Sequence, residues 1–145
     1  MPGKSTDADA RHIFKRWHET LMKGDAKGIA ELYAEDAVFE SPAVWVLNEQ
    51  SDGMLRGRQA IETYFESFLT KLGAPTAEWY RDGTYFFNGE LLMWEYPRQA
   101  PHGNQNDIVE SIDVVDGKIA YHRVYWGWVG VKNFVARMNA AAATK

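Results

Sequence analysis

The chain contains no cysteine among its 145 residues. It therefore has no disulfides, no thiol nucleophile and no cysteine-ligated metal. Long hydrophobic runs are also missing: no stretch of about 18 apolar residues is present, and the first residues, MPGKSTDADARH, contain no apolar segment typical of a secretion signal. We expect a cytoplasmic protein without a membrane partner.

Positive charge is scarce and scattered. Sixteen Lys and Arg residues stand against 20 Asp and Glu residues, which gives a net charge of −4 and a pI near 5.5. The basic residues form no run or stripe, so we expect no nucleic-acid partner.

Several chemical motifs are absent as well. The four histidines, at positions 12, 18, 102 and 122, have no H-x-H or H-E-x-x-H spacing. The sequence has no G-x-G-x-x-G or Walker-type loop and no G-x-S-x-G elbow. These absences predict a protein without a metal, without a nucleotide cofactor and without a serine nucleophile of the elbow type.

Aromatic residues, in contrast, are abundant. Six Trp, seven Tyr and seven Phe make up 14% of a chain whose length fits a single domain, residues 1–145. Such rings either fill a core or line a pocket for flat apolar ligands. Composition leaves both interpretations open.

Three helices are predicted in the first half of the chain. Thr6 and Asp9 form a capping-box pattern, and Gly24 follows as a stop signal. Asp25 caps a short second helix, with Tyr33 expected on its apolar side. A third helix is predicted from apolar residues at helical spacing, closed by Gly73: Ala60, Ile61, Tyr64, Phe65, Phe68, Leu69 and Leu72.

The second half is predicted to be mostly strands. After a short strand at 37–41 and a long irregular segment at 43–57 that we interpret as a lid or rim, four segments are rich in aromatic and β-branched residues: AEWYRDGTYFF, ELLMWEY, DIVESIDVV and KIAYHRVYWGWVGV. Asn88-Gly89 and Asp116-Gly117 are hairpin signals between them. The tail RMNAAAATK is expected to be a frayed helix end. Helices followed by antiparallel strands indicate an α+β fold.

This order of elements, together with KGDAKGIAELYAEDAVFESP, GRQAIETYF and DGKIAYHRVYW, resembles the nuclear transport factor 2-like superfamily. Within it the chain is similar to the SnoaL-like branch of polyketide cyclases, ketosteroid isomerases and limonene-epoxide hydrolases. The resemblance implies a cone-shaped barrel, in which a curved mixed, mostly antiparallel sheet wraps around three N-terminal helices. It also implies a homodimer formed through the outer face of the sheet, where Tyr121 and Tyr125 are expected.

A comparison with ketosteroid isomerases assigns positions for the site. Their general-base aspartate falls on Ser41, and their oxyanion-hole tyrosine falls on Trp17. Their protonated aspartic acid falls on Glu110 when one residue is dropped from the final hairpin. Two apolar pocket positions fall on His122 and Trp126. The Asp-Arg-Asp arrangement of the epoxide hydrolases has no counterpart at matching positions.

The strand pattern around these residues suggests which of them face a pocket. Glu110 alternates with apolar residues of DIVESIDVV, so it is either a pocket acid or, in the inverted register, a solvent-facing residue. His122 shares a strand face with Trp126, where it is either a satisfied core residue or an acid–base partner of Glu110. In FESPAVW, a regular strand points Glu40 and Ser41 to opposite faces.

We therefore expect a small-molecule enzyme that uses cofactor-free acid–base chemistry of the isomerase, dehydratase or cyclase type on an apolar carbonyl or polycyclic compound. The predicted catalytic groups are Glu110 and His122, and Trp17 and Ser41 are predicted to donate hydrogen bonds to a substrate oxygen. Three further pocket walls are predicted at Trp45, Trp94 and Trp126. The alternative is a non-catalytic dimeric module of the same fold that binds a ligand or serves in assembly.

Overall fold

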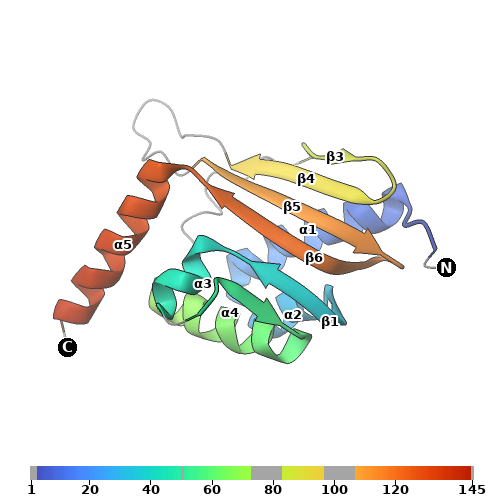
Figure 1. Cartoon of the computed structure of the whole chain (residues 1–145). Helices are drawn as coiled ribbons and strands as arrows, with labels where there is room; N and C mark the ends of the chain where they lie inside the picture. The colour runs from blue at the N-terminus through green and yellow to red at the C-terminus, as the bar shows by residue number, and fades with distance from the viewer. Residues whose placement is uncertain (1–2, 50, 73–82, 97–106, 145) are drawn as a thin grey trace.

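The computed structural model describes residues 3–49, 51–72, 83–96 and 107–144. These residues form an α+β fold with helices on one side of a twisted sheet (Figure 1). The elements, in chain order, are α1 (Asp7–Lys23), α2 (Ala26–Ala30), β1 (Tyr33–Glu40), α3 (Pro42–Leu47), β2 (Met54–Arg56), α4 (Arg58–Leu72), β3 (Phe86–Phe87), β4 (Leu91–Tyr96), β5 (Ile108–Val115), β6 (Lys118–Trp126) and α5 (Trp128–Ala143).

The sheet has six strands in the order β2-β1-β6-β5-β4-β3. β1 runs parallel to β6, and the other neighbouring pairs are antiparallel. The predicted mixed, mostly antiparallel sheet is confirmed. It is not closed into a barrel, because β2 and β3 remain as two edges.

The core lies between this sheet and the helices. The buried face of α1 includes Phe14 and Trp17, and α4 contributes Phe65. Trp17 packs edge-on against Phe65 with ring centroids 5.6 Å apart, and Phe14 packs edge-on against Trp94 of β4 at 5.3 Å. These contacts fix the first and fourth helices against the sheet and leave one end of the layer between them for a cavity.

The predicted helix caps are present. The Thr6 hydroxyl accepts a hydrogen bond from the backbone N–H of Asp9, whose carboxylate accepts one from the N–H of Thr6. These bonds with Thr6 stabilise the ionised carboxylate and lower the pKa of Asp9. Gly24 ends α1 with φ +68°, and the Asp25 carboxylate caps α2 by accepting from Gly28 N–H.

The predicted hairpin turns are also confirmed. Asp116 and Gly117 both have positive φ, +49° and +71°, between β5 and β6, as a two-residue hairpin turn requires. Between β3 and β4, the Asn88 side chain accepts from two backbone N–H groups, and Gly89 has φ +100°.

Three local predictions were wrong. Tyr33 begins β1 instead of lying in the second helix, because α2 ends at Ala30 and the chain then joins the sheet. The segment 43–57 is largely regular: Pro42 occupies the first turn of α3, and β2 pairs with β1. The last strand stops at Trp126, since Gly127 starts helix α5.

Part of the expected strand at 77–87 lies outside the described residues, as does the predicted stop at Gly73. The described portion of that strand is the short β3 at the sheet edge.

Candidate functional site

A small cavity lies between the inner face of the sheet and helices α1, α3 and α4. Its volume is about 40 Å³. We call it the inner cavity. Its described wall is apolar and aromatic with one charged side chain, Glu110, and consists of Trp17, Leu21, Phe39, Ser41, Ala43, Tyr64, Phe65, Phe68, Tyr96, Ile108, Glu110, Val124 and Trp126.

Glu110 reaches this wall because of the register of β5. Its cross-strand neighbours are Trp94 on β4 and Val124 on β6. It shares the inner face with Ile108 and Ile112, and it is only 5% exposed. The inward register predicted for Glu110 is thus the one observed, and a carboxyl group is held among apolar side chains, where it requires hydrogen-bond partners.

The carboxyl group of Glu110 is hydrogen bonded to a histidine. His122 Nε2 lies 2.6 Å from Glu110 Oε2, and His122 is completely buried. On the other side of the ring, His122 Nδ1 lies 2.6 Å from the hydroxyl oxygen of Tyr33. The three residues form a continuous row, the Glu110–His122–Tyr33 chain, whose Glu110 end lines the cavity.

Tyr33, at one end of this chain, keeps its proton. Burial, together with the charge of Glu110, raises the pKa of Tyr33 well above its usual value, so its hydroxyl stays protonated. A protonated hydroxyl can donate to Nδ1, and in the tautomer in which it does so, Nε2–H donates to the Glu110 carboxylate. Arg58 holds the backbone of Tyr33, because its Nε and Nη2 donate to the Tyr33 carbonyl at 2.9 and 2.7 Å.

Two further tyrosines belong to the cavity wall. Burial first, and then the nearby Glu110 carboxylate, raise the pKa of Tyr64 and of Tyr96 far above the usual range. Both hydroxyl groups are therefore neutral across the physiological range, and a neutral hydroxyl can donate a hydrogen bond.

Trp17 lines the cavity, but its N–H group is already engaged. The indole nitrogen donates to the Tyr96 hydroxyl at 2.9 Å. The expectation that Trp17 donates to a substrate oxygen does not fit this arrangement; its ring forms part of the wall, and its N–H holds Tyr96 in place.

Ser41 and Glu40 face opposite sides, as alternation predicts. Ser41 is buried in the cavity wall, and its hydroxyl caps α3 by accepting from Ala43 N–H at 3.2 Å. Glu40 lies on the outer face, where its carboxylate accepts from the Tyr121 hydroxyl at 2.9 Å. The serine therefore has a structural task at the start of α3 in addition to its place in the wall.

The three tryptophans predicted as walls occupy different places. Trp45 is half exposed and contributes to a groove on the outside, beside Arg123 and Tyr125. Trp94 is buried in the core, tilted against Trp17 at 6.2 Å, and is not among the described wall residues. Trp126 does line the inner cavity.

The N–H group of Trp126 is unusual. Its nitrogen is buried and has no hydrogen-bond partner among the described residues. Leaving a donor unpaired in this way costs about 1–3 kcal/mol. A ligand oxygen is one means by which such a donor becomes satisfied.

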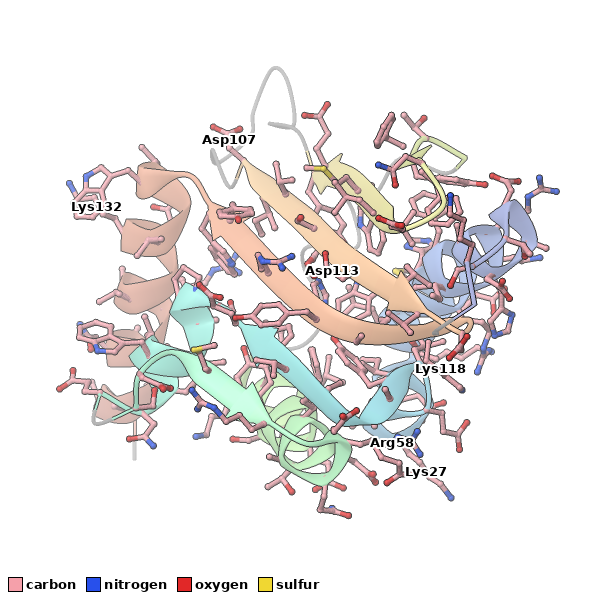
Figure 2. All side chains as sticks on the ribbon, turned by 45° about the vertical axis from the view of Figure 1, so that its right-hand side comes forward. Lys27, Arg58, Asp107, Asp113, Lys118 and Lys132 are labelled. Carbon is pink, nitrogen blue, oxygen red and sulfur yellow. The ribbon has the colours of Figure 1, made fainter. Side chains whose placement is uncertain are left out.

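The outer face of the sheet carries an arginine ion pair. Arg123 forms two hydrogen bonds with the Asp113 carboxylate, at 3.1 and 2.7 Å, and its guanidinium lies 4.3 Å from the centre of the Tyr121 ring. Figure 2 labels Asp113 on β5.

Several residues of the site were not predicted. Tyr33, Tyr64 and Tyr96 were not expected in it because each looks like an ordinary core residue in the sequence. The signal available for Tyr64 was its place on the apolar face of the third helix. No local signal marks Tyr33, whose partner His122 lies 89 residues further along the chain.

Within the described parts of the chain, no group of three or more His, Cys, Asp or Glu side chains is arranged to hold a metal ion. In the same residues, no helix is long and apolar enough to cross a membrane.

An open mixed sheet packed on N-terminal helices is the arrangement of the nuclear transport factor 2-like fold, which this chain shares with solved structures. The chain belongs to the SnoaL-like family of that fold: the model of the SnoaL-like domain matches residues 14–122. No curated protein matches it at a significant level.

Solved structures with the same fold are numerous, at low sequence identity. A putative isomerase from Bacillus subtilis is 22% identical with a TM-score of 0.67, over 87% of this chain and 91% of that one. An LEH-like epoxide hydrolase of M. tuberculosis is 16% identical with a TM-score of 0.63, over 94% and 96%. The epoxide hydrolase/cyclase-like enzyme SalBIII, described in pyran ring formation in the polyether salinomycin, is 22% identical with a TM-score of 0.57, over 86% and 96%. At these identities the likeness establishes the fold.

Proposed function

We propose that this protein is a small-molecule enzyme that performs cofactor-free acid–base chemistry in the inner cavity, of the isomerase, dehydratase or cyclase type, on an apolar carbonyl compound. One observation carries the proposal: the cavity wall holds a buried carboxylate that is hydrogen bonded at 2.6 Å to a fully buried histidine. The similarity to proteins described as an isomerase, an epoxide hydrolase and a cyclase supports it.

Glu110 is the proposed catalytic residue because it is the charged group in the described wall. Its carboxylate removes a proton from a carbon next to the substrate carbonyl, the electron pair moves to the carbonyl oxygen, and Glu110 becomes a neutral acid. It then returns the proton to another atom of the substrate, so that no oxidant or other reactant is consumed. The neutral hydroxyl of Tyr64 is the proposed donor to the oxygen on which charge develops.

For His122 we propose a role other than that of the second catalytic group predicted from the sequence. His122 is not among the described wall residues and lies behind Glu110. We assign it a positioning role: its Nε2–H holds one carboxylate oxygen and leaves the other directed to substrate. Ser41 and Trp126 remain proposed contacts of the bound molecule.

The test uses exchange with solvent, which needs no knowledge of the product. Small ketones of increasing size are incubated with the protein in D2O, and loss of the proton signal next to the carbonyl is followed by ¹H NMR. The wild type should exchange at least one ketone. Glu110→Gln should lower that rate by at least a hundredfold, whereas Glu90→Gln, in the exposed β3–β4 turn, should leave it unchanged. Equal rates for wild type and Glu110→Gln would refute the role of Glu110.

The second candidate is a non-catalytic ligand-binding module. The observation that favours it is Ser41, which occupies the position of the ketosteroid isomerase base and is used as a helix cap. This hypothesis predicts ligands that stabilise the protein against heat without any proton exchange with solvent or turnover.

We also propose that the protein is a homodimer through the outer face of the sheet. Tyr125 is 56% exposed there, and Trp45 beside it is 50% exposed. Exposed aromatic side chains gathered on one face are typical of protein interfaces. Light scattering at micromolar concentration should give twice the chain mass, and Tyr125→Asp should halve it; a wild-type monomer would contradict the proposal.

A further inference from the structure

Helix α5 is attached to the rest of the molecule by few side chains. Only Gly130 and Phe134 are buried among its 16 residues, and its N-terminus at Gly127 has no side-chain cap. Trp128 is 73% exposed, and the residues from 139 to 144 are exposed as well. In Figure 1, α5 projects from the end of the sheet, past α3.

The position of α5 places it at one particular end of the inner layer. Figure 2 shows Lys132 of α5 at the opposite end of the molecule from Lys118, which begins β6 after the β5–β6 turn. The end beside α5 is the end at which β6 finishes, with Trp126. Trp126 belongs to the wall of the inner cavity, so α5 begins shortly after a wall residue.

Phe134 is the residue of α5 that contacts the cavity wall. Its ring stacks on Phe68 at 6.1 Å with the planes 25° apart, and it packs against Trp126 at 5.4 Å. Both of these partners line the inner cavity. The ring of Phe134 therefore packs against the aromatic wall of the cavity without being one of its described residues.

The inner cavity is too small for the ligands that its walls are suited to. Its volume is about 40 Å³, whereas an apolar cavity that binds benzene has roughly 150 Å³. A planar ring therefore enters only if a residue in the wall, or one packed against it, moves. The buried and unpaired N–H belongs to Trp126, whose ring packs against Phe134.

We propose that Phe134 occupies a binding subsite for a planar ring, and that a ligand takes its place when α5 swings away. The ligand class is an apolar molecule of two or more fused rings that carries a hydrogen-bond-accepting oxygen, and the Trp126 N–H binds that oxygen. The proposal rests on the proposed function only in placing the substrate in the same cavity.

Two physical features support this exchange of one ring for another. A phenyl ring and a ligand ring make similar stacking contacts with Phe68 and Trp126, so removal of Phe134 leaves a surface of matching shape. The ligand adds an oxygen for the Trp126 N–H, which Phe134 does not provide. Displacement of the helix is opposed by few buried contacts.

The experiment compares 1-tetralone, a two-ring aryl ketone, with tetralin, the same rings without oxygen, by isothermal titration. Phe134→Ala should bind 1-tetralone at least tenfold more tightly than wild type, since the ligand no longer has to displace a ring. Arg137→Ala, an exposed substitution on the same helix, should bind like wild type. Trp126→Phe should keep the affinity for tetralin and lose the preference for 1-tetralone.

A second measurement covers the case in which Phe134→Ala does not fold. Hydrogen exchange of the wild type with 1-tetralone should accelerate in α5 and slow down in β5 and β6. Unchanged or slower exchange in α5 would overturn the proposal, as would Phe134→Ala that binds no more tightly than Arg137→Ala.

The same titration in Glu110→Gln separates this inference from the proposed function. Tight binding in Phe134→Ala/Glu110→Gln, without proton exchange in any variant, supports the subsite and refutes the enzyme. Proton exchange of small ketones, together with no effect of Phe134→Ala on binding, supports the enzyme and refutes the subsite.

Discussion

Tyr33 is the residue on which the hydrogen-bond order of the site depends. Its hydroxyl stays protonated, and when it donates to His122 Nδ1, the imidazole presents its Nε2–H to Glu110. Tyr33 is not among the described residues of the cavity wall, so we assign it a positioning role that acts through the histidine.

Tyr33→Phe removes this hydroxyl and leaves Nδ1 buried without its donor. We expect a loss of about 1–3 kcal/mol in the free energy of unfolding and a mixture of imidazole tautomers in ¹⁵N NMR spectra, where the wild type has the Nε2–H form alone. Tyr121→Phe is the matched control, since it removes a hydroxyl that bonds the outward Glu40. If Tyr33→Phe kept a single tautomer, the same as in the wild type, Tyr33 would not determine the hydrogen-bond order of the site.

Among the elements, α3 begins directly after a residue with two roles: Ser41 caps the helix and lies in the cavity wall. Replacement of a capping serine by alanine costs about 1 kcal/mol, whereas glycine at the same place costs only a few tenths. The two substitutions remove the same hydroxyl at different cost to the helix.

We therefore expect Ser41→Ala to lose about 1 kcal/mol of stability in urea unfolding and Ser41→Gly to lose much less. If the hydroxyl serves only as a cap, both variants keep the wild-type rate of ketone exchange. An equal fall of the rate in both variants would instead identify Ser41 as a group that contacts substrate.

The elements that the sequence predicts well are those with local signals. The capping box at Thr6, the stop at Gly24 and the two-residue turn at Asp116 each depend on neighbours within a few residues, and each is present. The inward register of Glu110 was also predictable, because β5 alternates and a resemblance fixed its phase.

The predictions that were wrong concern residues whose structure depends on contacts distant in the sequence. Tyr33 looks apolar and adjoins a helix, yet it pairs with β6 from far along the chain. Residues 128–131 were interpreted as strand because Trp and Val favour strands, whereas they begin a helix that Phe134 anchors against Phe68. The engagement of Trp17 by Tyr96 likewise joins residues 79 positions apart.

At the scale of the whole molecule, three buried tyrosines govern stability at alkaline pH. Burial raises the pKa of Tyr33, Tyr64 and Tyr96 above the value near 10 that they have when unfolded. Below that value all three are protonated in both states, and stability is fully present. Above it the unfolded chain releases protons that the folded chain retains, so stability falls as pH rises.

Each of these tyrosines contributes a slope of about 1.4 kcal/mol per pH unit above pH 10 or so. Urea unfolding at pH 9, 10 and 11 should therefore show a steep loss, and Tyr64→Phe should reduce the part of the slope due to these tyrosines by about a third, since one of three groups is removed. A slope that Tyr64→Phe leaves unchanged would contradict the burial of its hydroxyl.

Chemical rescue tests whether a carboxylate at position 110 performs proton transfer inside the cavity. Glu110→Ala should fold, fail to exchange the ketone protons in D2O, and recover exchange in proportion to added formate, which supplies a small carboxylate beside His122. Chloride at the same ionic strength should restore nothing. A Glu110→Ala variant that exchanges at the wild-type rate without formate would contradict the account.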